Sequence, residues 1–173
     1  LDVVDDGDTL LDLCTGTGCI GISLAKMKDI RVTLADISDF ALDCARENIE
    51  RLGVENKVNA IKHDIFSDVP EECFDIITSN PPYITEDEMK ELSADVKNEP
   101  TLALFGGKDG LDFYRTISER YKPFLKSGGY IFFEVGYKQS ADVAAILEKN
   151  GYTNIKIKKD YNNTERVVLA RKS

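Results

Sequence analysis

The sequence predicts an α/β fold: a doubly wound, mostly parallel seven-stranded sheet with an antiparallel final strand. Strand-like apolar runs alternate with helical patterns along the whole chain, which is typical of parallel sheets built from β-α-β units. The first predicted strand leads directly into a glycine turn, Gly16-Thr17-Gly18, and then into a helical pattern. The last two predicted strands are joined through a short link at 160–163, which permits a hairpin and therefore antiparallel pairing.

Seven segments are predicted to be strands, because each is a short apolar run bounded by turn residues. The segment over 74–79 runs directly into two prolines. Prolines cannot continue a sheet, since they have no backbone N–H to donate. The full set of predicted strands is 8–13, 31–35, 57–62, 74–79, 130–135, 152–158 and 166–170.

Helical spacing of apolar residues appears between most of these strands. Ile20, Leu24 and Met27 carry this spacing after the glycine turn. Ser38 is the predicted N-cap of a second helix, which ends at Gly53. Further helices are predicted over 111–125 and 141–149. The apolar face of the second helix consists of Ala41, Ala45, Ile49 and Leu52.

A long polar stretch separates the two prolines from Pro100, and we expect it to be the most mobile part of the chain. Within it, Thr85 and Glu88 have the spacing of a capping box, in which two side chains bond to backbone N–H groups at a helix start. One short helix is therefore predicted in this stretch.

Composition and charge narrow the possible functions. Hydrophobic residues make up 42% and charged residues 31% of the 173 residues, which is ordinary for a globular protein, and we expect one domain over 1–173. The net charge of −9 disfavours direct nucleic-acid binding, which usually needs a basic face. No apolar run approaches the ~20 residues that span a bilayer, so no membrane association is expected.

The cysteines and the histidine do not form the pattern of a metal site. Cys14, Cys19, Cys44 and Cys73 include no C-x-x-C pair, and His63 is the only histidine in the sequence. We therefore expect no metal ion. Reduced and mostly buried thiols in a cytoplasmic protein are the better interpretation.

Gly16, Gly18 and Gly21 spell G-x-G-x-x-G between the first strand and the first helix. Glycines let the backbone approach a ligand closely, and the start of a helix offers free N–H groups. The pattern alone is weak, because a tight turn with close helix packing needs the same glycines. Asp12, just before the turn, would fix the loop or lie near a cationic ligand.

Two carboxylates strengthen the prediction of a ligand at this turn. Asp36 ends the second strand, where it would accept hydrogen bonds from both hydroxyls of a ribose. Asp64 ends the third strand, where it could accept from the amino group of an adenine. Each alone is also typical of a solvated acid, but together they favour an adenosine ligand. NAD and S-adenosylmethionine both satisfy this pattern, and the final strand pair favours the second.

The tetrapeptide Asn80-Pro81-Pro82-Tyr83 follows the fourth strand, at the same sheet edge as the glycine turn. A residue before proline is restricted to extended geometry, so the Asn80 side-chain oxygen and the Pro81 carbonyl become two fixed acceptors. Tyr83 can cover the flat face of the group that they hold. The tetrapeptide alone is equally typical of a rigid surface turn, but its position here favours a site for a planar –NH2 group.

Such a site suits methyl transfer to a planar nitrogen, which is a poor nucleophile because its lone pair is delocalised. Acceptors on both N–H bonds orient the nitrogen and favour the positive charge that develops on it. No base is required beforehand, because the proton is acidic after transfer. His63 is accordingly expected to be a polar strand-end residue or part of the adenosine pocket.

These residues resemble the class I S-adenosylmethionine-dependent methyltransferases with a Rossmann-like sheet. Within that group, the chain is most similar to the HemK/PrmC family of release-factor glutamine methyltransferases. The resemblance covers nearly all 173 residues. Beyond the tetrapeptide it includes the segments NEPTLALFGGKDGLDFYRTISE, LKSGGYIFFEVGYKQ and NGYTNIKIKKDYNNTERVVLARK.

The resemblance implies transfer of a methyl group from S-adenosyl-L-methionine to the glutamine side-chain amide in the Gly-Gly-Gln motif of peptide-chain release factors. The partner is then a release factor, and the reaction is cytoplasmic. Catalysis and amide binding fall to Asn80, Pro81 and Tyr83, with Pro82 also in the substrate site. The pocket walls would include Glu99-Pro100 and Phe133-Glu134. The implied cofactor-binding residues are Cys14, Thr15, Gly16, Thr17, Gly18, Asp36, Ile37, Asp64, Ile65 and Asn80.

The chain departs from the family pattern at three points. Cys14 stands where the family usually has glycine, so the loop needs less backbone freedom there or binds the cofactor differently. Thr101 stands where the family usually has arginine, which leaves no charge at that position. The family's N-terminal helical domain, which helps grip the release factor, is absent, so we expect a fragment or a partner that is held differently.

Three other functions fit parts of the sequence. A nucleic-acid amino-methyltransferase would use the same tetrapeptide, but the negative charge and the lack of a target-recognition insert weigh against it. A cofactor-binding module with little activity alone would follow from the missing N-terminal domain. An NAD-dependent oxidoreductase would leave residues 80–83 unexplained.

Overall fold

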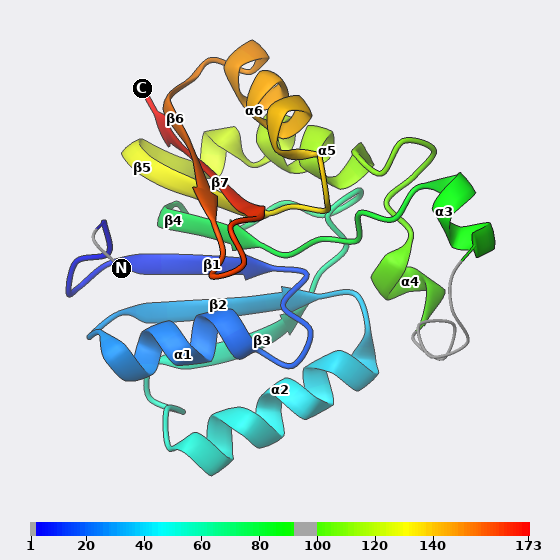
Figure 1. Cartoon of the computed structure of the whole chain (residues 1–173). Coiled ribbons are helices and arrows are strands. Elements are labelled where there is room, and N and C mark those ends of the chain that lie inside the picture. Colours follow the sequence, from blue (N-terminus) through cyan, green and yellow to red (C-terminus); the bar gives the residue numbers. More distant parts are fainter. Residues whose placement is uncertain (1–2, 92–99) are drawn as a thin grey trace.

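The computed structural model describes residues 3–91 and 100–173, and its central feature is one seven-stranded sheet (Figure 1). The seven strands, in order across the sheet, are β3 (Val58–Lys62), β2 (Arg31–Asp36), β1 (Thr9–Leu13), β4 (Phe74–Ser79), β5 (Leu125–Glu134), β7 (Glu165–Lys172) and β6 (Tyr152–Lys159). β1 to β5 pair in parallel, and β7 runs antiparallel to both of its neighbours. The predicted fold class, with its antiparallel final strand, is confirmed.

Helices lie on both faces of this sheet and beyond one of its edges. They are α1 (Cys19–Met27), α2 (Asp39–Leu52), α3 (Glu86–Glu91), α4 (Thr101–Leu104), α5 (Asp112–Arg120) and α6 (Ser140–Lys149). α1 and α2 cover β1, β2 and β3 on one face, and α5 and α6 pack on the opposite face of the sheet. α3 and α4 lie beyond the carboxyl ends of the parallel strands (Figure 1).

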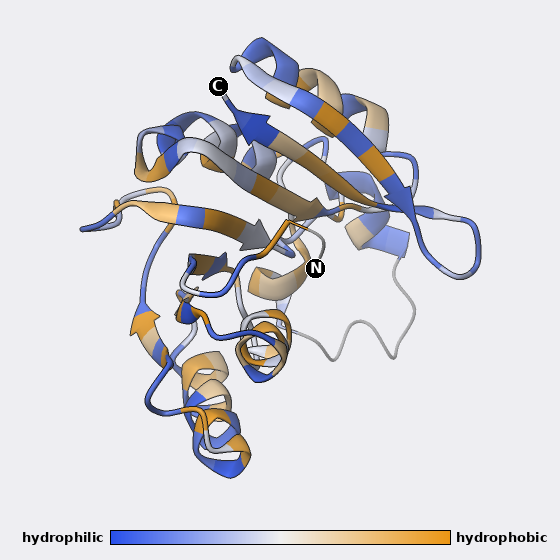
Figure 2. Cartoon of the chain, turned by 90° about the vertical axis from the view of Figure 1, so that its left-hand side faces the viewer, coloured by the Kyte–Doolittle hydropathy of each residue, from blue (hydrophilic) through white to orange (hydrophobic). Residues whose placement is uncertain are grey.

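Two buried clusters, one on each face, hold the sheet between these helices. Leu10 of β1 packs in one cluster with Ile22 of α1 and Ile49 of α2. Leu11, the next residue, packs in the other cluster with Tyr114 of α5. Successive strand residues point to opposite faces, so the completely buried β1 joins both clusters. α2 and β6, which each have one face toward solvent, carry both hydrophilic and hydrophobic residues (Figure 2).

The helix predicted over 111–125 is wrong at its carboxyl end. α5 stops at Arg120, and a 3-10 helix, η2 (Lys122–Phe124), precedes β5. Pro123 explains the difference, because it has no N–H to donate and disfavours α-helical geometry in the residue before it. β5 consequently begins at Leu125, before the predicted start of this strand.

The apolar residues with helical spacing in α1 and α2 are only partly buried. Met27 is 57% exposed and Leu52 is 40% exposed. The buried residues of α1 are instead Gly21, Ile22 and Ala25. Gly21 and Ala25 let this helix approach the sheet closely, so Ile22 is the only large apolar residue among the buried residues of α1.

The cysteines are less buried than the sequence predicted. Cys19 and Cys73 are exposed, whereas Cys14 and Cys44 are partly buried. Cys19 is the first residue of α1 and Cys73 directly precedes β4. Both exposed thiols thus lie at the start of an element, next to a surface turn.

The capping box predicted at the start of α3 is confirmed. The Thr85 N–H donates to the Glu88 carboxylate at 2.9 Å, and the Glu88 N–H donates to the Thr85 hydroxyl at 3.2 Å. α4 was not predicted, and residues 92–99 of the stretch expected to be mobile lie outside the described residues. Within the described part of the chain, no helix is long and apolar enough to cross a membrane.

Candidate functional site

The candidate site lies at the carboxyl ends of the parallel strands, where the strand register brings several predicted residues together. Leu13, the last residue of β1, pairs with Ala35 of β2 and with Ser79 of β4. The glycine turn, Asp36 and Asn80 follow these three paired residues directly along the chain. One edge of the sheet therefore carries the turn, the acid and the tetrapeptide side by side.

The glycine turn has an open side and a tightly packed side. Gly16 and Gly18 have left-handed backbones, with φ of 57° and 81°, which glycine adopts without steric cost. A Cβ built on Gly16 would meet no heavy atom within 4 Å, whereas a Cβ on Gly21 would lie 2.4 Å from Leu34 Cδ2. The two explanations for the glycine motif therefore apply to different residues: Gly16 leaves room for a ligand, and Gly21 lets α1 pack on β2.

Cys14, which begins the turn, also has a left-handed backbone, with φ of 54°. The position therefore requires the backbone freedom that glycine provides in the family pattern, and the expectation of a smaller requirement is wrong. Burial raises the pKa of the Cys14 thiol, and the neighbouring Asp36 carboxylate adds to this shift. The thiol consequently stays protonated at neutral pH.

Asp12 fixes the turn through side-chain hydrogen bonds. Its buried carboxylate accepts hydrogen bonds from the hydroxyls of Thr15 and Thr78, at 2.6 and 2.7 Å, and from the Gly21 N–H at 3.2 Å. Burial raises the pKa of Asp12 above its ordinary value, and these hydrogen bonds oppose that shift. Of the two predicted roles for Asp12, fixing the loop is confirmed.

Asp36 and α2 hold the turn from the side. The Gly16 N–H donates to one Asp36 oxygen and the Ser38 N–H donates to the other, both at 2.9 Å. A carboxylate oxygen has two lone pairs, so each still has one to offer to a ligand hydroxyl. Asn48 of α2, which the sequence did not single out, donates from Nδ2 to the Thr17 carbonyl at 2.9 Å.

The residues after β2 and β3 differ in how far they are available to a ligand. Ile37, directly after Asp36, is 40% exposed, whereas Ile65 is 6% exposed and belongs to the core. The Asp64 carboxylate accepts from the Phe66 N–H at 2.9 Å and so shapes the loop after β3. Ile37 is therefore open to solvent and Asp64 is partly exposed, whereas Ile65 anchors its loop in the core.

His63 is a buried polar residue at the end of β3. Its Nε2 lies 2.7 Å from the hydroxyl of Tyr121, which is itself completely buried. Burial lowers the pKa of His63 below its ordinary value of 6.5, and the Asp68 and Asp64 carboxylates oppose that shift. The residue therefore takes the first of its two predicted roles, that of a strand-end residue tied to the end of α5.

The tetrapeptide after β4 has an exposed first residue on a firmly held backbone. Asn80 is exposed, Pro81 and Pro82 are buried, and Tyr83 is partly buried. Ile84 then forms a parallel bridge with Phe105, which fixes the far end of the segment. An exposed amide on a fixed backbone is the arrangement expected of a preorganised acceptor.

The predicted pocket walls are only partly in place. The Tyr114 hydroxyl donates to the Glu134 carbonyl at 3.0 Å, which joins α5 to the end of β5. Phe133 is completely buried and its ring centroid lies 5.2 Å from that of Tyr114. Phe133 therefore supports the site from the core and does not line it. Glu99 lies outside the described residues, and Pro100 is exposed.

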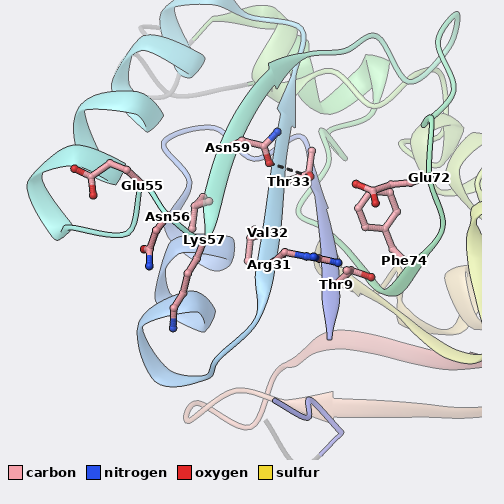
Figure 3. A pocket seen from close by; sticks show the side chains of 11 residues that line it. Thr9, Arg31, Val32, Thr33, Glu55, Asn56, Lys57, Asn59, Glu72 and Phe74 are labelled. Carbon is pink, nitrogen blue, oxygen red and sulfur yellow. Dashed lines mark hydrogen bonds between the residues drawn. The ribbon is translucent and has the colours of Figure 1, made fainter. Parts of the chain in front are cut away.

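A cavity of about 220 Å³ occupies a different part of the molecule (Figure 3). Thr9, Arg31 and Phe74, the first residues of β1, β2 and β4, are among its lining residues. It therefore opens near the amino ends of the strands, whereas Gly16 and Asn80 lie at their carboxyl ends. This cavity is not the site that the strand register assembles.

Comparison with known proteins points to methyltransferases. The methyltransferase small domain family matches residues 1–98. The release factor glutamine methyltransferase of Clostridium acetobutylicum is 46% identical over 163 residues, which are 92% of this chain and 57% of that protein. The protein of the same name from Thermodesulfovibrio yellowstonii is 37% identical over 173 residues, which are 99% of this chain and 62% of that protein. This chain thus spans little more than half of the length of these relatives.

Solved structures share the fold at much lower identity. A methyltransferase from Pyrococcus furiosus matches with a TM-score of 0.75 at 22% identity, covering 98% of this chain and 77% of that one. A SAM-dependent methyltransferase from Aquifex aeolicus matches with a TM-score of 0.69 at 20% identity, covering 98% and 84%. The family match over residues 1–98 includes the glycine turn, both strand-end acids and the tetrapeptide, and the chain belongs to the methyltransferase small domain family.

Proposed function

We propose that this chain is the catalytic unit of an S-adenosylmethionine-dependent enzyme that methylates the glutamine side-chain amide in the Gly-Gly-Gln motif of peptide-chain release factors. The observation that carries the proposal is the position of Asn80-Pro81-Pro82-Tyr83 beside the glycine turn, at one edge of the sheet. The names of the relatives, at 37 to 46% identity over most of this chain, support the choice of substrate. Release factors act in the cytoplasm, which is where we place the reaction.

The residues around the glycine turn fit S-adenosylmethionine. The open space over Gly16 admits a ligand against the backbone, and both Asp36 oxygens keep a lone pair for ribose hydroxyls. Asp64 and the exposed Ile37 would border the adenine. When bound there, S-adenosylmethionine supplies an electrophilic methyl group.

The tetrapeptide holds the nitrogen that accepts this group. The Asn80 side-chain oxygen and the Pro81 carbonyl each accept a hydrogen bond from one N–H group of the glutamine amide. The Tyr83 ring covers the flat face of this amide. This geometry aims the nitrogen at the methyl carbon and stabilises the positive charge that develops on the nitrogen. The two prolines make the acceptors rigid, so little reorganisation is needed as the charge forms.

The proton leaves after transfer, and His63 does not take it. The imidazole is buried and bonded to the Tyr121 hydroxyl, and burial lowers the pKa of His63 below its ordinary value. A methylated amide that carries positive charge is a strong acid, so water accepts the proton readily. The site therefore works by orientation and charge stabilisation, without a dedicated base.

A labelling experiment tests this function. The purified chain is incubated with methyl-labelled S-adenosylmethionine and, in parallel, with a release factor, the same factor with alanine in place of the Gly-Gly-Gln glutamine, DNA and ribosomal RNA. We expect label in the unmodified release factor alone. Label in nucleic acid alone would support the amino-methyltransferase alternative, and cofactor binding without transfer would support a cofactor-binding module.

Asp36→Ala is expected to weaken cofactor binding about 10- to 100-fold, because two hydrogen bonds to a charged acceptor are lost. Isothermal titration with S-adenosylmethionine measures the affinity. The matched control is Asp39→Ala, three residues further along, whose exposed carboxylate pairs with Lys62 and not with the glycine turn. Equal affinities for the Asp36 variant and the unmodified chain would remove Asp36 from the site.

A further inference from the structure

The side-chain amide of Gln139 connects the tetrapeptide to two other segments of the chain. Gln139 Nε2 donates to the Tyr83 carbonyl at 2.9 Å and to the Gly110 carbonyl at 3.5 Å. Gln139 Oε1 accepts from the Gly136 N–H at 3.0 Å. One amide thereby joins the tetrapeptide, the loop before α5 and the turn between β5 and α6.

Three glycines allow these segments to pack closely against Tyr83, because they have no side chain. A Cβ on Gly110 would lie 2.3 Å from the Tyr83 carbonyl oxygen, and a Cβ on Gly106 would lie 2.7 Å from Tyr83 Cα. A Cβ on Gly136 would lie 2.8 Å from Tyr83 Cδ2 and 2.6 Å from Gln139 Oε1. Both the backbone and the ring of Tyr83 are therefore closely packed against these glycines, and the Gln139 side chain hydrogen-bonds to the Tyr83 carbonyl.

We propose that Gln139 is a positioning residue for methyl transfer: it fixes Tyr83, and through Tyr83 the pose of the substrate amide on Asn80 and Pro81. The proposal rests on the function proposed above. Gln139 acts through Tyr83 and not on the reacting atoms, since its side-chain amide bonds to main-chain groups of Tyr83, Gly110 and Gly136.

The pattern of contacts requires a glutamine at this position. Nε2 faces two carbonyl oxygens and therefore has to be a donor, whereas Oε1 faces an N–H and has to be an acceptor. Glutamate has the same shape but would set a second acceptor against two carbonyls. Methionine has a similar length but would leave both partners without their side-chain bond.

Loss of this bond is expected to act on the chemical step and not on the cofactor. A shift of the tetrapeptide by about 1 Å misaligns the nitrogen with the methyl carbon, and such misplacement lowers rates by up to about 100-fold. The hydrogen bonds of the Gln139 side chain do not involve Gly16 or Asp36, the residues proposed to bind the cofactor. The cofactor affinity should therefore stay unchanged.

The test compares Gln139→Glu and Gln139→Met with Asp142→Ala, an exposed change in the first turn of α6, the helix for which Gln139 is the N-cap residue. We expect the single-turnover rate on a release factor to fall about 10- to 100-fold in both Gln139 variants, with cofactor Kd within about twofold of the unmodified chain. The Asp142 variant should keep both values. Unchanged rates in the Gln139 variants, or a loss of cofactor affinity that matches the loss of rate, would overturn the proposal.

Hydrogen exchange separates this inference from the proposed function. The Ile84 N–H donates to Leu104 and the Gly106 N–H donates to Ile84, both at 2.9 Å, so these two amides report whether the segment around Tyr83 is held. Their exchange should quicken in the Gln139 variants and not in Asp142→Ala. Should the unmodified chain fail to methylate any release factor, the proposed function fails, yet faster exchange still supports the structural part of the inference, that Gln139 fixes the segment around Tyr83, and unchanged exchange overturns it.

Discussion

Asn80 is exposed although the two prolines that follow it are buried, so its side chain can be changed without disturbing the backbone that carries it. We predict that Asn80→Ala lowers methyl transfer by about 100- to 1,000-fold, because one of two acceptors for the substrate amide is lost. Single-turnover transfer to a release factor measures the rate, and equilibrium titration measures the retained cofactor affinity.

Asn59→Ala is the matched control for this change. Asn59 is an exposed asparagine on β3. Its side chain accepts a hydrogen bond from the Thr33 hydroxyl near the amino ends of the strands, away from Asn80 (Figure 3). The control should transfer the methyl group at the unmodified rate. An Asn80 variant as active as this control would show that the amide acceptor is not needed.

His63 gives the fold a pH dependence of known sign. Burial lowers the pKa of His63 below 6.5, so the unfolded chain takes up this proton first as the pH falls. The stabilising contribution is complete above pH 6.5 and is lost as the pH falls through the lower folded-state pKa. One proton limits the slope to about 1.4 kcal/mol per pH unit.

Urea unfolding at several pH values between about 7.5 and 5.5 measures this slope. His63 is the only histidine in the sequence, so His63→Gln should flatten the dependence in this range. The glutamine amide keeps a partner for the Tyr121 hydroxyl. The same slope in both proteins would mean that another group titrates there.

The sequence predicted which residues lie together where their placement depends on position along a strand. Asp36 and Asn80 each follow a predicted strand, and parallel strands end at one edge of a sheet. Gln139 could not be found in this way, because its contact with Tyr83 spans 56 positions in sequence. The left-handed backbone of Cys14 was equally hidden, since cysteine is not typical of that conformation.

Among the elements, Gly16 of the glycine turn and Gly21 of α1 are expected to differ in role: Gly16 affects cofactor binding, and Gly21 affects the stability of the fold. Gly21→Ala should lower the free energy of unfolding by about 1–2 kcal/mol, because its Cβ would crowd Leu34 and Val32, an effect only partly offset by better helix propensity. Gly16→Ala should cost about 1 kcal/mol for its left-handed backbone.

Cofactor affinity distinguishes the two glycine variants. Gly16→Ala places a methyl group in the open space over the turn and should weaken S-adenosylmethionine binding about tenfold or more, whereas Gly21→Ala should change it much less. Chemical unfolding and calorimetric titration of both variants provide the comparison. Weaker binding in Gly21→Ala than in Gly16→Ala would reverse the roles assigned to these glycines.

Element types were predictable from the sequence, and element ends were less so. The alternation of strands and helices is local information, and the capping box at Thr85 and Glu88 is fixed by spacing alone. The end of α5 depends on Pro123 inside an otherwise helical pattern. The buried face of α1 depends on close packing by Gly21, which an apolar pattern does not reveal.

For the whole molecule, the parallel sheet determines where the chemistry takes place. The strand order places the glycine turn of β1 between the acid of β2 and the tetrapeptide of β4. A ligand on the turn would therefore touch both neighbours, which is why a cofactor and a methyl acceptor can meet there. β7 and β6 extend the sheet beyond β5, on the side away from β1 to β3 (Figure 1).

The position of the transferred methyl group on the release factor decides whether this chain methylates the glutamine amide. After incubation of a release factor with the chain and S-adenosylmethionine, tandem mass spectrometry of the peptide that contains Gly-Gly-Gln locates the modification. We predict one methyl group on the side-chain nitrogen of that glutamine. A methyl group on any other residue of the release factor, with this glutamine unmodified, would contradict it.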